Sequence, residues 1–65
     1  MSATVVTYEK RLRSWDGNGP CWEVVEVRDE PGFFYAQRRV VAYFPAHQVL
    51  EAAKHVQTLT ATAAL

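Results

Sequence analysis

Several features that mark common classes of protein are missing from this sequence. Seven Lys and Arg residues balance seven Asp and Glu residues, so the basic excess that duplex-binding domains use against phosphates is absent. The single cysteine, Cys21, excludes an internal disulfide and fits a reducing cytoplasm better than a secreted mini-protein. The first residues carry no basic signal region, and no apolar run approaches the ~18–20 residues of a membrane span. These absences predict a soluble cytoplasmic protein with no membrane partner.

Groups that carry catalysis or bind metals are also scarce. The two histidines, His47 and His55, flank Glu51 at four-residue steps, which would bring all three near one side of a helix. Zinc needs three or four converging ligands, and no cysteine or further histidine is available to complete that set. An unpaired cysteine in a strand is more often an inert thiol than a nucleophile. The sequence therefore predicts neither an enzyme nor a protein that binds a metal or a cofactor.

The length of the chain allows one small domain, comprising residues 1–65. Hydrophobic residues make up 49% of the sequence, which is typical of a globular rather than a disordered chain. A domain of this size buries roughly 60% of the surface that its unfolded form exposes. We expect a net stability of only ~3–5 kcal/mol.

The first half of the chain predicts two antiparallel strands. Residues 4–15 are rich in β-branched and aromatic side chains spaced in twos, and residues 16–20 (DGNGP) have the composition of a turn. In the second strand, residues 21–28, Val24 and Val25 break strict alternation, which indicates a bulge or a strand covered on both faces. Two neighbouring registers would pair opposite charges across the two strands. The charged residues concerned are Lys10, Arg11, Arg13, Glu23 and Glu26.

A turn is predicted at residues 29–32, because Pro31 followed by Gly32 is typical of the two central positions of a type II turn. The stretch that follows has two interpretations. Residues 33–44 form one long strand, or only residues 40–44 pair with the second strand and residues 33–39 form an exposed arm. In the second interpretation Val40, Ala42 and Phe44 share one face of the strand.

The remainder of the chain predicts one amphipathic helix. Proline is favoured at the first position of a helix, so we expect the helix to begin at Pro45. The tail beyond Leu59 has a weak pattern and is expected to fray. Residues at three- and four-residue spacing should face the sheet, namely Val49, Leu50, Ala53, Val56 and Leu59. The predicted fold is α+β: a three-stranded antiparallel sheet with one C-terminal helix packed on one face (βββα).

The number of large rings exceeds what one helix can cover. The rings are Tyr8, Trp15, Trp22, Phe33, Phe34, Tyr35, Tyr43 and Phe44. Some must therefore cover the second face of the sheet or contact a partner. Aromatic residues beside arginines are typical of protein interfaces, so the predicted partner-binding residues are Phe33, Phe34, Tyr35, Arg38 and Arg39. Two other outcomes remain open, a two-sided core and a homodimer formed through an unpaired edge strand.

A small sheet-type nucleic-acid binder is the alternative function. Arginines and aromatic residues on an exposed sheet can stack on bases or enter a groove. The predicted order of elements is similar to that of plant-type AP2 domains and integrase arm-binding domains. The zero net charge counts against this alternative, and so does neutralisation of Arg11 and Arg13 by Glu23 and Glu26.

In size, missing catalytic groups and its content of alanine, valine and arginine, the chain resembles small proteins carried by bacteriophages and mobile elements. Anti-CRISPR proteins are the class among these whose members are often single domains that block a host complex by surface binding. That resemblance implies a non-enzymatic protein-binding module whose partner is a host protein or nucleoprotein complex.

Overall fold

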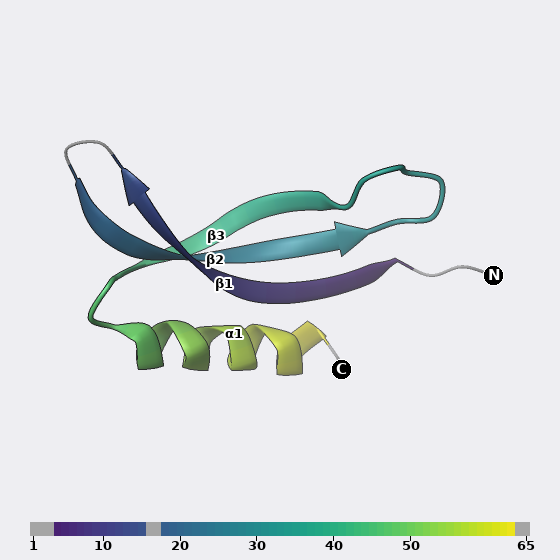
Figure 1. The fold of residues 1–65 in the computed structure, drawn as a ribbon. Helices are drawn as coiled ribbons and strands as arrows, with labels where there is room; N and C mark the ends of the chain where they lie inside the picture. The colour runs from purple at the N-terminus through teal and green to yellow at the C-terminus, as the bar shows by residue number, and fades with distance from the viewer. Residues whose placement is uncertain (1–3, 16–17, 64–65) are drawn as a thin grey trace.

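The computed structural model describes residues 4–15 and 18–63, which form three strands and then one helix. The elements are β1 (Val5–Trp15), β2 (Asn18–Asp29), β3 (Gln37–Pro45) and α1 (Val49–Ala63). The strands form one antiparallel sheet in the order β1-β2-β3, and α1 lies along one face of it (Figure 1). The predicted βββα fold is confirmed. We call the face that α1 covers the helix face and the opposite one the open face.

The register between β1 and β2 decides which charges meet. Arg11 lies opposite Glu23, which confirms the expected pairing of opposite charges for this residue. Lys10 lies opposite Val24 instead, and its Nζ atom sits 4.9 Å from the centre of the Trp22 ring. A cation over an aromatic face is stabilised by the ring quadrupole. In this register Lys10 therefore contacts a ring of β2 rather than one of its glutamates.

The turn predicted at residues 16–20 is replaced by strand in the part that the structure describes. Residues 16 and 17 lie outside the described residues, and residues 18–20 belong to β2 rather than to a turn. The pairing of β1 with β2 shifts between Arg13 and Trp15, opposite this segment. Pro20 lacks an N–H to donate, and such an irregular site is where a strand tolerates proline.

The central strand β2 is covered on both faces. Val24 pairs with Ala42 on the helix face, Val25 pairs with Val40 on the open face, and both valines have zero exposed surface. Val41 is the extra residue between these two pairs, so β3 carries a bulge at this point. The sequence left two alternatives open for this strand, a bulge or cover on both faces, and the structure has both. Because of the bulge, Val40 lies on the face opposite to Ala42 and Phe44, contrary to the expectation that all three share one face.

The helix starts later than the sequence predicts. Pro45 is the last residue of β3, and the N–H of Gln48 donates to the Pro45 carbonyl at 2.9 Å in the turn that precedes α1. The indole Nε1 of Trp22 donates to the carbonyl of Ala46 at 3.1 Å, which ties this turn to the sheet. This anchor places the turn where proline preference alone would have begun the helix.

The helix is rotated from its predicted orientation, since Ala53 and Val56 are half-buried as predicted but Val49 and Leu50 are exposed. Ala52 has zero exposed surface, whereas Val49 is 39% and Leu50 69% exposed. His55, which is not among the residues predicted to face the sheet, has its ring centre 5.5 Å from that of Phe44. The prediction that Val49 and Leu50 face the sheet is wrong, because the small side chain of Ala52 lets the helix approach the strands closely.

The C-terminal part of α1 remains helical as far as Ala63 instead of fraying after Leu59. The hydroxyl of Thr58 donates to the carbonyl of Lys54 at 3.0 Å, and that of Thr62 donates to the carbonyl of Thr58 at 2.9 Å. Threonine hydroxyls satisfy these backbone acceptors within the helix. Leu59 is half-buried, as its spacing predicts.

Candidate functional site

Three consecutive exposed aromatic residues lie in the loop between β2 and β3. Phe33 is 57% exposed, Phe34 99% and Tyr35 85%. This loop forms one end of the sheet, beyond the reach of α1 (Figure 1). We call Phe33, Phe34 and Tyr35 the aromatic tip. Three consecutive rings in solvent form an apolar surface that monomeric proteins seldom leave without a function.

The start of the loop has a defined turn. The N–H of Phe33 donates to the carbonyl of Glu30 at 3.4 Å, one residue later in the chain than the predicted turn at 29–32. Gly32 has a φ of 91°, a conformation that side-chain-bearing residues rarely adopt. Pro31 and Gly32 thus occupy the second and third positions of the turn, as in a type II turn. The turn directs the chain away from β2, so that the three rings follow outside the sheet.

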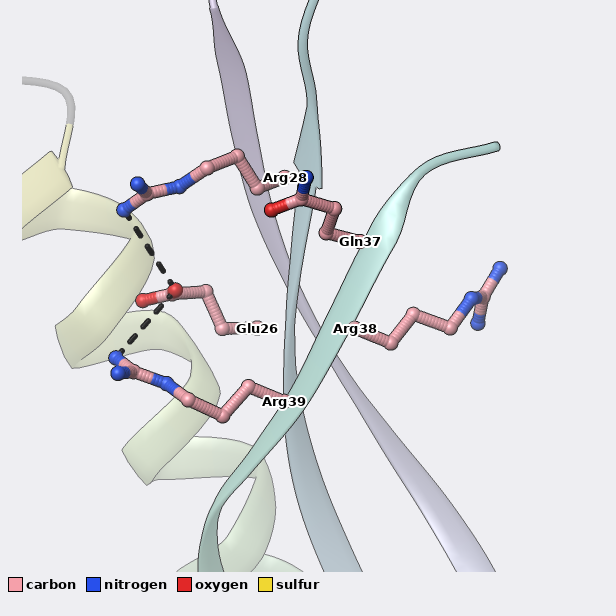
Figure 2. Close-up of a pocket in the computed structure, with 5 residues that line it drawn as sticks. All are labelled: Glu26, Arg28, Gln37, Arg38 and Arg39. Carbon is pink, nitrogen blue, oxygen red and sulfur yellow. Dashed lines mark ion pairs between the residues drawn. The ribbon is translucent and has the colours of Figure 1, made fainter. Parts of the chain in front are cut away.

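The structure separates the two arginines that were predicted to join the aromatic tip. Both lie in β3, where successive side chains point to opposite faces. Arg38 reaches across the open face, and its Nη1 atom is 2.8 Å from Oε1 of Glu9. Arg39 points to the helix face, with its Nη2 atom 3.5 Å from Oε1 of Glu26 (Figure 2). The five predicted residues therefore do not form one continuous arm, since the strand begins at Gln37.

A depression of about 330 Å³ lies beside the loop and is lined entirely by charged or polar residues. The lining residues are Glu26, Arg28, Gln37, Arg38 and Arg39. Two guanidinium groups, of Arg28 and Arg39, lie 3.8 and 3.5 Å from Oε1 of Glu26 (Figure 2). Small-molecule sites are mostly apolar, so this depression does not match that class.

Glu26 also accepts a hydrogen bond from β1. The hydroxyl of Tyr8 donates to Oε2 of Glu26 at 3.0 Å. This hydrogen bond to Glu26, together with partial burial, raises the pKa of Tyr8 above its ordinary value of 10.0. The carboxylate of Glu26 thus joins β1, β2 and β3 on the helix face.

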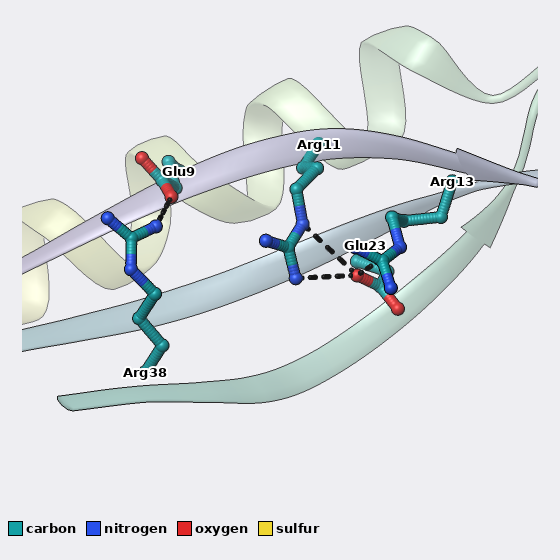
Figure 3. Close-up of polar contacts among 5 residues, drawn as sticks. All are labelled: Glu9, Arg11, Arg13, Glu23 and Arg38. Carbon is teal, nitrogen blue, oxygen red and sulfur yellow. Dashed lines mark hydrogen bonds and ion pairs between the residues drawn. The ribbon is translucent and has the colours of Figure 1, made fainter.

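The open face carries a second cluster of ion pairs (Figure 3). Glu23 is buried, with 2% of its surface exposed, and its Oε1 atom accepts from Nε and Nη2 of Arg11 at 3.3 and 3.0 Å. Nε of Arg13 lies 3.8 Å from the same oxygen. The predicted neutralisation of Arg11 and Arg13 is confirmed for Glu23, whereas Glu26 pairs with Arg28 and Arg39 instead. The burial of Glu23 has no signal in the local sequence. It depends on side chains from β1 lying over β2.

The residues considered for catalysis or metal binding do not converge. Cys21 is half-buried in β2, His47 is exposed in the turn before α1, and His55 contacts Phe44. Within residues 4–15 and 18–63, no three His, Cys, Asp or Glu side chains gather closely enough to hold a metal ion. In the same part of the chain, no helix has the length and apolar character needed to cross a membrane.

Comparison with known proteins finds no match to a protein-family model, to a curated protein or to a solved structure. The aromatic tip, the polar depression and the charged open face are the features of the molecule that bear on its function.

Proposed function

We propose that this chain is a non-enzymatic protein-binding module that contacts its partner through the aromatic tip. The observation that carries this proposal is the exposure of three consecutive rings, of which Phe34 is 99% exposed. Aromatic side chains supply large contact areas at low entropic cost and dominate interface energetics. The complementary surface on the partner is an apolar groove wide enough to take the rings of Phe34 and Tyr35.

The arrangement of charges favours a protein partner over nucleic acid. Three arginines line the depression beside the aromatic tip, which is the observation in favour of the nucleic-acid alternative. Each of them, however, lies within 4.0 Å of a carboxylate: Arg28 near Glu26 and Glu30, Arg38 near Glu9, and Arg39 near Glu26. Phosphate binding would have to compete with these ion pairs in a chain of zero net charge.

The binding test compares three immobilised proteins in pull-downs from host-cell lysate. The wild type and Leu50→Ala should retain the same partner, because Leu50 is an exposed apolar residue on α1, remote from the loop. The double variant Phe34→Ala with Tyr35→Ala should lose it while keeping the wild-type circular dichroism spectrum. A folded double variant that retains the partner as well as the wild type does would refute the proposed contact.

The nucleic-acid alternative has its own measurement. Labelled duplex and single strands are titrated at low and high salt, with Arg38→Gln as the matched variant. Binding that weakens with salt and with Arg38→Gln, but persists in the aromatic-tip variant, would replace the protein-binding proposal. We expect no salt-sensitive binding.

The finer proposal is that the partner is a host nucleoprotein complex and that the chain acts as a phage-encoded inhibitor. Its support is the resemblance in size and composition to anti-CRISPR proteins. Expression in a bacterium with active CRISPR immunity should restore plaque formation by a targeted phage, and the Phe34→Ala variant should restore less. Unchanged immunity would reject this finer proposal and leave the binding proposal to the pull-down.

A further inference from the structure

The outer edge of β1 is a long strand edge that nothing in the described residues covers. β1 has eleven residues and pairs only with β2. The other outer strand, β3, is interrupted by the bulge at Val41 and ends at Pro45, two features that hinder further pairing. From Val5 to Arg13, β1 has neither a proline nor a register shift. An unpaired edge of this kind is a template for another strand.

The sequence of β1 is complementary to itself when two copies run antiparallel. A two-fold axis through Lys10, the midpoint of Val5–Trp15, pairs residues 7–13 of one strand with the same residues of the other, all within the regular part of the edge. Glu9 of one copy then lies opposite Arg11 of the other, and this pair occurs twice. Each of the two would be shared with the ion pair that it already forms in its own copy, Glu9 with Arg38 and Arg11 with Glu23. Tyr8 lies opposite Leu12, again twice. Opposite charges and aromatic–aliphatic pairs at facing positions stabilise antiparallel strands.

The neighbouring axes are less favourable. An axis through Glu9 would set two Glu9 carboxylates face to face, and an axis through Arg11 would do the same with two guanidinium groups. The axis at Lys10 does place two lysines opposite each other. Their ammonium groups, however, lean away from the edge, because each lies over the Trp22 ring of its own copy. Like charges at facing positions destabilise a sheet, so of these three axes the one at Lys10 has the smallest penalty.

The exposure of Leu12 agrees with this axis. Leu12 lies on the helix face but is 53% exposed, because α1 leaves this end of β1 uncovered. Tyr8 of a second copy would lie beside it and remove part of that apolar surface from water. The same axis therefore pairs the charges on the open face and covers the exposed leucine on the helix face.

We propose that a second copy of this chain binds the outer edge of β1, with β1 pairing antiparallel to β1 about a two-fold axis at Lys10. The dimer has one continuous six-stranded sheet, with both helices on the same face and an aromatic tip on each copy. This inference is independent of the partner proposed for the aromatic tip, since the loop does not take part in the pairing.

The first test is sedimentation of the wild type from micromolar to millimolar concentration, together with two lysine variants. Leu12→Lys removes both Tyr8–Leu12 contacts and adds charge beside Lys10, so the dimer dissociation constant should rise about tenfold. Leu50→Lys makes the same change at an exposed leucine on α1 and should leave the dissociation constant unchanged. A wild type that stays monomeric throughout, or dimers weakened equally by both variants, would overturn the proposal.

The second test fixes the register by cross-linking in a Cys21→Ser background. Lys10→Cys places the two introduced thiols directly opposite each other, so mild oxidation should give a covalent dimer. Thr7→Cys introduces an exposed thiol three residues from the axis, and the two thiols then lie about 20 Å apart, so no dimer should form. Equal cross-linking of both variants would show random collision or another register, and would overturn the axis at Lys10.

Discussion

Glu23 is the buried charge on which the open face depends. It lies in the middle strand, and the guanidinium groups of Arg11 and Arg13 from β1 lie over it. Its partners remain partly in water, with 38% and 47% of their side chains exposed, so the pairing costs less desolvation than a fully buried triad does. The Glu9–Arg38 pair, by contrast, is about half exposed at both ends. The two pairs should therefore differ in their contribution to stability.

Replacing Glu23 tests this difference. Glu23→Gln keeps the shape of the side chain but removes the charge that both arginines face, and we expect a loss of about 2 kcal/mol in the free energy of unfolding. The control Glu9→Gln should lose less than about 1 kcal/mol, as exposed ion pairs do. Urea unfolding followed by tryptophan fluorescence measures both values. Equal losses in the two variants would contradict the role assigned to Glu23.

Tyr8 makes stability depend on pH in the alkaline range. Its pKa is raised in the folded state by the hydrogen bond to Glu26, so the unfolded chain ionises first as pH rises. The stability that Tyr8 contributes is fully present below its ordinary pKa of 10.0 and is lost as pH rises through the higher folded pKa. Tyr8→Phe should therefore reduce the fall in urea midpoint above about pH 10. An unchanged pH profile in this variant would show that the hydroxyl has no such role.

At the scale of the element, the orientation of α1 is decided by the residue that fits closest to the sheet. Ala52 is completely buried, whereas the larger Leu50 is 69% exposed. A small side chain at the contact allows the helix axis to lie near the strands, and it leaves room for His55 against Phe44. Apolar spacing in α1 is compatible with more than one rotation of the helix, so the fit against Trp22 and Phe44 selects between them.

Two substitutions in α1 separate these orientations. Ala52→Leu inserts three carbon atoms into a closed contact and should destabilise the protein by about 1–3 kcal/mol. Leu50→Ala removes three carbon atoms from a mostly exposed position and should change stability by less than about 0.5 kcal/mol. Thermal or urea unfolding gives both numbers. The reverse ranking would mean that α1 faces the sheet through Leu50.

The loop between β2 and β3 and the start of β3 hold neighbouring side chains in different surroundings. The aromatic tip follows the turn that Gly32 allows, outside the sheet, while Arg38 and Arg39 lie inside β3 and alternate between its faces. The rings are free to contact a partner, and the arginines serve ion pairs within the chain. Residues 33–39, which the sequence allows as one exposed arm, therefore divide into a loop that carries the rings and the start of β3, which carries the arginines.

At the scale of the whole molecule, the interior is very small. The Cα atoms span 45 × 26 × 11 Å, so the protein is thin, and within the described residues the fully buried hydrophobic side chains are those of Val24, Val25 and Ala52. A three-stranded sheet with one helix cannot enclose more. Ion pairs on both faces of β2 cover part of what a second layer would cover in a larger domain.

A small interior makes each buried methyl group important. Val24→Ala removes two carbon atoms from a site with no exposed surface, and we expect a loss of about 2 kcal/mol. Because a domain of this size has only ~3–5 kcal/mol of stability, the urea midpoint should fall by roughly half. The exposed Val5, at the start of β1, provides the control, since Val5→Ala should cost much less. A Val24→Ala variant as stable as the control would show that the interior lies elsewhere.

The sequence by itself determined the order of the elements, the facing of opposite charges across the first two strands and the surplus of rings. These features depend on local spacing, on turn residues and on counting, which neighbouring residues along the chain suffice to establish. Only the tertiary structure decided the rotation of α1, the placement of the bulge in β3 at Val41, the burial of Glu23 and the register between β1 and β2. Each of these depends on how side chains distant in sequence fit across a twisted, pleated sheet, and no local pattern encodes that fit.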